Sequence, residues 1–256
     1  MKKNIIIVVL SLAIITISAL TTGFAYAKLV KTAYGTTETA TVARFGVTLT
    51  WGSEGLFSDN YSTAGGKTSV QMQDSAKGIA PGASGSTTLT VGGESEISIS
   101  LKIGVQATHT GWTLTDGTAY MPIVFVIMKG DKYLQADYTY ATTKHTFAMS
   151  DMQNANIEMD TILAGTTLDQ EYSIGWEWAA TGSVPSDTYY ICTTADSDYK
   201  VGDIIGAETY NYILTDEQFE NFEALTSTDE IDSYICSKAT LPTLSVGLKA
   251  IAEQLI

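Results

Sequence analysis

The chain has 256 residues and a formal net charge of −14 at pH 7, because 28 acidic residues outnumber 14 basic ones. A negative charge of this size repels nucleic acids and anionic lipids, so neither is expected as a partner. The length suffices for a substantial buried core without a dense framework of disulfides.

The N-terminus has the pattern of a secretory signal peptide. Two lysines at positions 2 and 3 precede an uncharged apolar run over residues 5–20, and Ala25-Tyr26-Ala27 supplies the small residues of an A-x-A cleavage site. The alternative is an uncleaved membrane anchor, although the run is shorter than the roughly 20 apolar residues of a membrane span. We therefore expect residues 1–27 to be removed during export, and residues 28–256 to form the mature protein.

Alternation of apolar and polar residues predicts antiparallel strands along the mature sequence. A period of two places successive side chains on opposite faces of a strand. The pattern occurs in residues 43–51, 97–105 and 172–178. Residues 122–128 are apolar on both faces and lead into Lys129-Gly130-Asp131-Lys132, which is typical of a central strand followed by a hairpin turn.

Two helices are predicted between the strands. The first covers Ser150–Leu163, where Ser150 and Gln153 form a capping box and apolar residues follow on one stripe. The second begins at Thr215, which pairs with Gln218 in the same motif, and continues through apolar residues at a spacing of three as far as position 225.

The remaining signals complete an all-β prediction. Residues 244–252 alternate again and predict a final strand, with a helix as the alternative because their composition also favours helices. Glycine-containing pairs and triplets at 65–66, 80–82, 92–93 and 116–117 predict loops. Many strands spaced by about ten residues, with few short helices in the connections, indicate an antiparallel sandwich or a barrel.

An acidic stretch over residues 185–240 is interpreted as an insertion or the edge of a subdomain. It contains the two cysteines of the chain, Cys192 and Cys236. In an exported protein a disulfide between them is favoured over two buried thiols. Such a bridge would pin the insertion to the body and stabilise the fold by about 4 kcal/mol.

The sequence offers little catalytic chemistry, and the chain is not expected to be an enzyme. Its two histidines, His109 and His145, stand apart, whereas a zinc protease site needs ligands at helical spacing. Asp196, Asp198 and Asp203 are weak candidates for Ca²⁺ ligands, because hard oxygen ligands gather there. A solvated acidic loop is the alternative, and no other cofactor is predicted.

The segment Trp176-Glu177-Trp178 has two interpretations. Adjacent aromatic rings can form a platform for sugar binding. Alternation, however, points both tryptophans to one face and Glu177 to the other, which favours packing of the indoles in the core.

Short motifs occur in a suggestive order along the chain. They are Ala43-Arg44-Phe45-Gly46-Val47, Gly55-Leu56-Phe57-Ser58-Asp59, Ala80-Pro81-Gly82-Ala83-Ser84-Gly85 before Glu94-Ser95-Glu96, Tyr172-Ser173-Ile174-Gly175-Trp176-Glu177-Trp178, and a closing strand with Gln254. In this order the sequence resembles the TasA/camelysin-like proteins of Gram-positive bacteria and some archaea. The resemblance implies a jelly-roll-like sandwich, export with a dedicated signal peptidase, and assembly into fibres of a biofilm matrix or pilus.

The same resemblance implies that an N-terminal segment of one subunit completes the sheet of the next. The candidate segment is Lys28–Ala40, in which Val30, Thr32 and Tyr34 are in phase. The alternative is a leader with no role in assembly.

The expected function is therefore that of a structural subunit, secreted to the cell surface or extracellular matrix. Its partners would be copies of itself, other matrix or minor fibre subunits and, during export, the signal peptidase, with no membrane contact after cleavage. The alternative is a monomeric cell-surface module that binds a ligand. A camelysin-like metallopeptidase is the third and weakest hypothesis.

Overall fold

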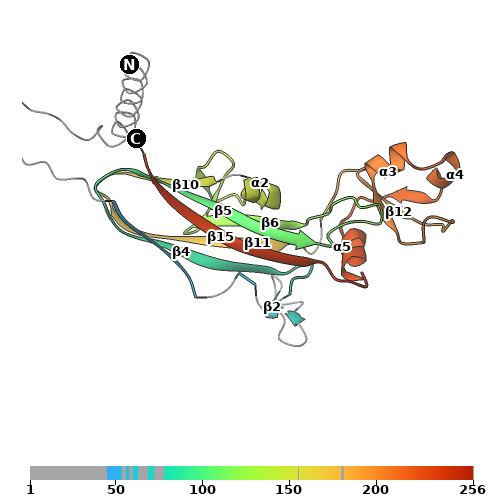
Figure 1. The fold of residues 1–256 in the computed structure, drawn as a ribbon, viewed down its shortest axis with the longest axis horizontal. Coiled ribbons are helices and arrows are strands. Elements are labelled where there is room, and N and C mark those ends of the chain that lie inside the picture. The colour runs from blue at the N-terminus through green and yellow to red at the C-terminus, as the bar shows by residue number, and fades with distance from the viewer. Residues whose placement is uncertain are drawn as a thin grey trace, which may run out of the picture. The chain divides into compact units, whose positions relative to one another are not determined.

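The structure is a computed structural model that describes residues 45–53, 56–57, 60–62, 69–71, 78–154, 156–179 and 182–255. All of these residues belong to one structural unit, Phe45–Ile256. The predicted signal peptide and the candidate assembly strand lie outside the described residues. The described part consists mainly of antiparallel strands (Figure 1).

The larger sheet has the strand order β1-β4-β11-β6-β7-β8, with β9 paired to β6. Its strands are β1 (Phe45–Trp51), β4 (Ser84–Ser95), β11 (Thr167–Trp178), β6 (Ile123–Lys129), β7 (Lys132–Leu134), β8 (Tyr140–Ala141) and β9 (Phe147–Ala148). Strand β6 lies inside the sheet and turns into β7 at Gly130, whose φ is 59°. The predicted central strand and its hairpin are thereby confirmed.

The second sheet has the order β10-β5-β15. Its strands are β10 (Ile157–Ile162), β5 (Ile99–Thr110) and β15 (Thr243–Gln254). Strand β15 pairs antiparallel with β5 along its whole length, from Thr243 opposite Thr110 to Gln254 opposite Ile99. The prediction of a final strand is confirmed, and the alternative of a helix is excluded.

The core lies between these two sheets and is filled by the inward-facing residues of both. Its largest fully buried side chains are Trp176, Tyr172, Phe125, Leu89, Ile99, Leu101, Ile103, Ile123, Ile127, Leu134, Met152 and Met159. Trp178 is also buried, whereas Glu177 between the two tryptophans is partly exposed. The antiparallel all-β sandwich is confirmed, and the tryptophans belong to its core.

Residues 189–224 form a small third sheet with the order β13-β12-β14. Its elements are β12 (Tyr189–Cys192), β13 (Ile204–Gly206), α3 (Ala207–Tyr212), α4 (Asp216–Phe219) and β14 (Phe222–Ala224). They enclose an apolar cluster of their own, made of Tyr190, Cys192, Ile205, Leu214 and Phe222. Helix α5 (Asp229–Cys236) then leads back to β15 (Figure 1). The segment lies within the acidic stretch, residues 185–240, that the sequence analysis interprets as an insertion.

The first predicted helix is wrong beyond Asn154. Helix α2 covers Met149–Asn154, and from Ile157 onward the chain pairs with β5 as β10. A register shift between Glu158 and Asp160 explains why a helix-like spacing arises in a strand. This bulge lets Ile162 be buried on the same side as Ile157, which plain alternation would not allow.

Two further predictions need correction. The capping box at Thr215 is present, with the Thr215 N–H donating to Gln218 Oε1 at 3.0 Å, but α4 ends at Phe219. Phe222 lies instead on β14. The predicted loop at Gly92-Gly93 lies inside β4, where Gly93 has a φ of 105°.

A short hairpin of β2 (Asn60–Ser62) and β3 (Ser69–Gln71) lies between β1 and β4 in the sequence.

Candidate functional site

The two histidines do not contribute to a metal centre in the described part of the chain. His109 is exposed near the end of β5, opposite Leu244 of β15. His145 packs its ring edge-to-face on Phe147 with 4.8 Å between the centroids. Over the described ranges, no three His, Cys, Asp or Glu residues are placed so that they could hold a metal ion.

The acidic loop uses its carboxylates to hold its own backbone. Asp196 Oδ1 accepts hydrogen bonds from the N–H groups of Asp198 at 2.7 Å and Tyr199 at 2.8 Å. These backbone bonds lower the pKa of Asp196. Asp203 Oδ2 accepts in the same way from the N–H of Lys200 at 2.8 Å. The geometry is that of a tight polar loop and gives the Ca²⁺ hypothesis no support.

The predicted disulfide is absent from the structure, in which both cysteines are free. Cys192 is buried in the small sheet and its thiol donates to the carbonyl of Thr194 at 3.2 Å. Cys236 ends helix α5 and is exposed. The two residues therefore belong to different parts of the fold, and the insertion is held by other contacts.

One side of the sandwich is closed by polar contacts between its two sheets. Asp160 on β10 accepts hydrogen bonds from Lys129 Nζ on β6 at 2.5 Å and from the Tyr172 hydroxyl on β11 at 2.8 Å. Strand β10 therefore lies against β6. The strand orders run β10-β5-β15 and β8-β7-β6-β11-β4-β1, so β15 and β1 each end their sheet on the side away from β10.

On the opposite side of the sandwich, β15 is the last strand of its sheet in the part of the chain that the structure describes. Among the described strands, β15 pairs only with β5, and β1 pairs only with β4. Among the described residues, no strand pairs with the outer side of β15, which is 12 residues long, and the Thr243 carbonyl at its start accepts a hydrogen bond from the Trp112 indole. The N–H and C=O groups of an unpaired edge are a template for another strand.

The apolar side chains at this open side are incompletely buried. They are Val47, Leu49 and Trp51 of β1, together with Leu244, Val246, Leu248, Ala250 and Ala252 of β15. They face inward, since Leu49 pairs beside the buried Val91 and Leu248 beside the buried Val105. In the described part of the chain, no strand lies on the side of β15 away from β5, and this place beside the partly exposed apolar row is called the vacant strand position below.

A cavity of about 600 Å³ lies at the beginning of β15. Its walls come from the chain before β4, from the core tryptophans, from α5 and from β15 itself. Representative lining residues are Ile79, Trp112, Trp178, Ile235, Leu241 and Val246. The vacant strand position therefore ends in a mainly apolar cavity.

Helix α5 forms one wall of this cavity and is fixed to the sandwich by a buried carboxylate. Asp232 is 3% exposed, and its Oδ1 accepts a hydrogen bond from the hydroxyl of Tyr120 at 2.7 Å. Its Oδ2 lies near the indole of Trp178 but makes no hydrogen bond of normal length in the described structure. Burial raises the pKa of Asp232, and the charge of Asp229 adds to the increase.

Two exposed contacts fix the same helix. The hydroxyl of Thr115 donates to Tyr234 Oη at 3.0 Å, and Lys238 Nζ donates to the carbonyls of Gly111 at 3.0 Å and Thr113 at 2.6 Å. No sequence pattern marks Asp232 or Tyr120 as part of this contact, because an aspartate between Ile231 and Ser233 has no periodicity that identifies it as buried.

We predict that Asp232→Asn raises the free energy of unfolding at pH 7. Because the folded state raises the pKa of this carboxyl, it binds the proton more tightly than the unfolded chain does. The wild-type protein should therefore lose stability as pH rises from the usual aspartate pKa through the raised one. The amide keeps a hydrogen-bond acceptor for Tyr120 and cannot ionise, so its advantage should shrink as pH falls toward 4.

Urea unfolding at several pH values measures this difference. Glu230→Gln is the matched control, because Glu230 is exposed on the same helix. An advantage of Asp232→Asn that does not change with pH would contradict the prediction.

Comparison of the chain with protein-family models, with curated proteins and with solved structures gives no match. The family resemblance seen in the sequence therefore stays a prediction. A search of the described residues for a helix long and apolar enough to cross a membrane finds none.

Proposed function

We propose that this protein is a secreted structural subunit of an extracellular fibre or matrix, and that subunits join at the open edge of β15. The observation that carries the proposal is the vacant strand position beside a half-buried apolar row. An extended segment placed there gains main-chain hydrogen bonds and buries alternate side chains. Each bond contributes roughly 1 kcal/mol, so a row of them together with apolar burial holds a stable joint.

The candidate segment has the right length for this position. A strand rises about 3.3 Å per residue, so the 12 residues of β15 extend over about 40 Å. Residues 28–40 in extended form cover the same distance. Val30, Thr32 and Tyr34 then share one face, which would turn toward the core of the receiving subunit.

The same geometry favours an extended peptide over a compact ligand. The cavity at the start of β15 is lined by four successive residues of the strand, Thr243–Val246. Successive residues of a strand point to opposite faces. The cavity therefore runs along the strand's edge, where a peptide in β-conformation adds on.

Deletion of Lys28–Thr39 tests the proposal. We expect the shortened mature chain to remain folded and monomeric, whereas the full mature chain forms polymers. Circular dichroism and thermal unfolding report the fold. Light scattering after size exclusion and negative-stain microscopy report assembly.

Two single substitutions provide a matched pair. Thr32→Asp places a charge on the face predicted to be buried, and Ala33→Asp places the same charge on the opposite face. Only the first is expected to suppress assembly. Fibres formed by the shortened chain would show that the joint lies elsewhere.

A further inference from the structure

The cavity at the start of β15 has a rigid aromatic wall. Trp112 and Trp178 are both buried, and their rings pack at 5.3 Å between centroids with a tilt of 60°. The Trp112 Nε1–H donates to the carbonyl of Thr243 at 2.9 Å, so the indole also fixes the first residue of β15. An incoming strand would therefore meet a preformed surface.

Helix α5 forms the wall of the cavity that contains the thiol of Cys236. Ile235 and Cys236 both line the cavity, and Asp232 holds their helix to Tyr120. Cys236 is exposed, whereas the other cysteine of the chain, Cys192, is buried. A thiol reagent applied to the folded protein therefore reports on the cavity.

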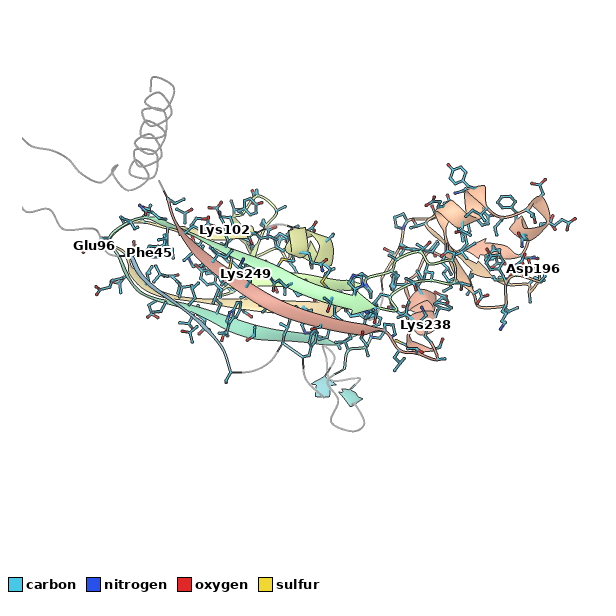
Figure 2. All side chains as sticks on the ribbon, viewed as in Figure 1. Phe45, Glu96, Lys102, Asp196, Lys238 and Lys249 are labelled. Atoms are coloured by element: carbon cyan, nitrogen blue, oxygen red, sulfur yellow. The ribbon has the colours of Figure 1, made fainter. Side chains whose placement is uncertain are left out.

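The orientation of a joining segment follows from the ends of the sandwich at which β1 and β15 begin. Phe45 lies at one end of the sandwich and Lys238, shortly before β15, lies at the other (Figure 2). A segment antiparallel to β15 enters at the Gln254 end and leaves beside Thr243. The body of the donating subunit then lies beyond that end, and each joint sets the Phe45 end of one copy against the Lys238 end of the next.

This head-to-tail contact repeats along a row of copies. The opposite orientation would set two Phe45 ends against each other, and parallel pairing is also slightly less stable per residue. In the antiparallel orientation, the register that brings Tyr34 to the cavity places it opposite Val246. Thr32 then lies opposite Leu248 and Val30 opposite Ala250, so the in-phase residues of the segment meet inward-facing residues of β15. Tyr34 is the only aromatic residue between positions 28 and 40, and it is in phase with the inward-facing Val30.

We propose that this cavity is the anchoring pocket of the joint, and that it receives the side chain of Tyr34 from a second copy of the chain. The inference rests on the proposed function, since it names the contact that selects the entering strand. A phenol ring suits the cavity, because aromatic side chains bury a large apolar area at low entropic cost and dominate binding when they enter preformed pockets. Its ring would lie against the two indoles and the wall formed by α5.

The experiment combines substitution of Tyr34 with labelling of Cys236 in the mature chain. We expect Tyr34→Ala to raise the concentration needed for assembly at least tenfold, and Tyr34→Phe to leave it within about threefold of the wild type. Leu29→Ala is the matched control, because it removes a large side chain from the opposite face of the same segment. It is expected to behave like the wild type.

Labelling with a maleimide supplies the second measurement. Burial raises the pKa of the Cys236 thiol, so the reaction is followed at pH 8.5. We expect the rate to fall at least tenfold when the wild-type chain assembles, relative to the chain lacking Lys28–Thr39.

The outcomes separate the two proposals. If fibres form while Cys236 stays as reactive as in the shortened chain, or if Tyr34→Ala assembles like the wild type, the anchoring pocket is refuted and strand addition stands. If the full mature chain does not assemble at all, both proposals fail.

Discussion

Replacing Gly93 by alanine is expected to lower the free energy of unfolding by about 3–5 kcal/mol, since backbone strain and overpacking add at this site. Gly93 has a φ of +105°, a conformation that L-residues rarely adopt. A Cβ atom there would lie 2.0 Å from the carbonyl oxygen of Gly46 on β1. The backbone of β1 would have to move away, which disrupts its pairing with β4 near this position.

Gly117→Ala is the matched control for this prediction. Gly117 has a φ of +86°, and a Cβ atom there would meet nothing within 4 Å. The substitution should therefore lower the free energy of unfolding only through left-handed backbone strain, by about 1–2 kcal/mol. Urea unfolding of both variants measures the difference, and equal losses would show that the approach of β1 to β4 is not what requires glycine at position 93.

The second large effect is expected at Trp176. This residue is 1% exposed, packs its ring on Phe57 at 5.3 Å, and donates from Nε1 to the carbonyl of Leu56 at 2.7 Å. Trp176→Ala should cost about 3–5 kcal/mol, because it removes a large buried ring and leaves a cavity. The hydrogen bond that joins β11 to the segment after β1 would be lost as well.

Trp176→Phe separates packing from hydrogen bonding. It retains an aromatic ring but leaves the Leu56 carbonyl without its donor, which should cost about 1–3 kcal/mol. Thermal and urea unfolding followed by circular dichroism give both values. A phenylalanine variant as unstable as the alanine variant would show that the hydrogen bond, not the ring, carries the effect.

Both variants also bear on assembly, because the disturbed elements border the vacant strand position. Strand β1, at the edge of the larger sheet, packs Val47, Leu49 and Trp51 against the core. A displaced β1 should therefore weaken the joint as well as the fold. Variants confined to the entering segment, such as Thr32→Asp, change the joint alone and so distinguish a loss of assembly from a loss of stability.

Alternation in the sequence was sufficient to predict several of the strands and the class of fold. Strands β5, β11 and β15 each show the alternation expected of one buried and one exposed face, and β6 shows the apolar run of an interior strand. These patterns are local, because the direction of each side chain in a strand depends only on its place in the alternation. The core positions of Trp176 and Trp178 followed from the same rule.

Contacts between distant parts of the chain set the places where alternation is broken and the strands that lie at the edge of a sheet. A bulge between Glu158 and Asp160 made a strand from residues whose spacing resembled a helix. The two cysteines, for which export favoured a bridge, are free because each packs with a different set of neighbours.

The position of the candidate site likewise follows from contacts between distant parts of the chain. Alternation at residues 244–252 predicted a strand but carried no information on how many neighbours that strand has. Among the described strands, β15 is the edge of its sheet because only β5 pairs with it, while β10, on the other side of β5, is joined to β6 through Asp160 and Lys129. Pairing partners and buried carboxylates such as Asp232 are set by contacts between residues far apart in the chain, and these contacts arise only when the sheets pack.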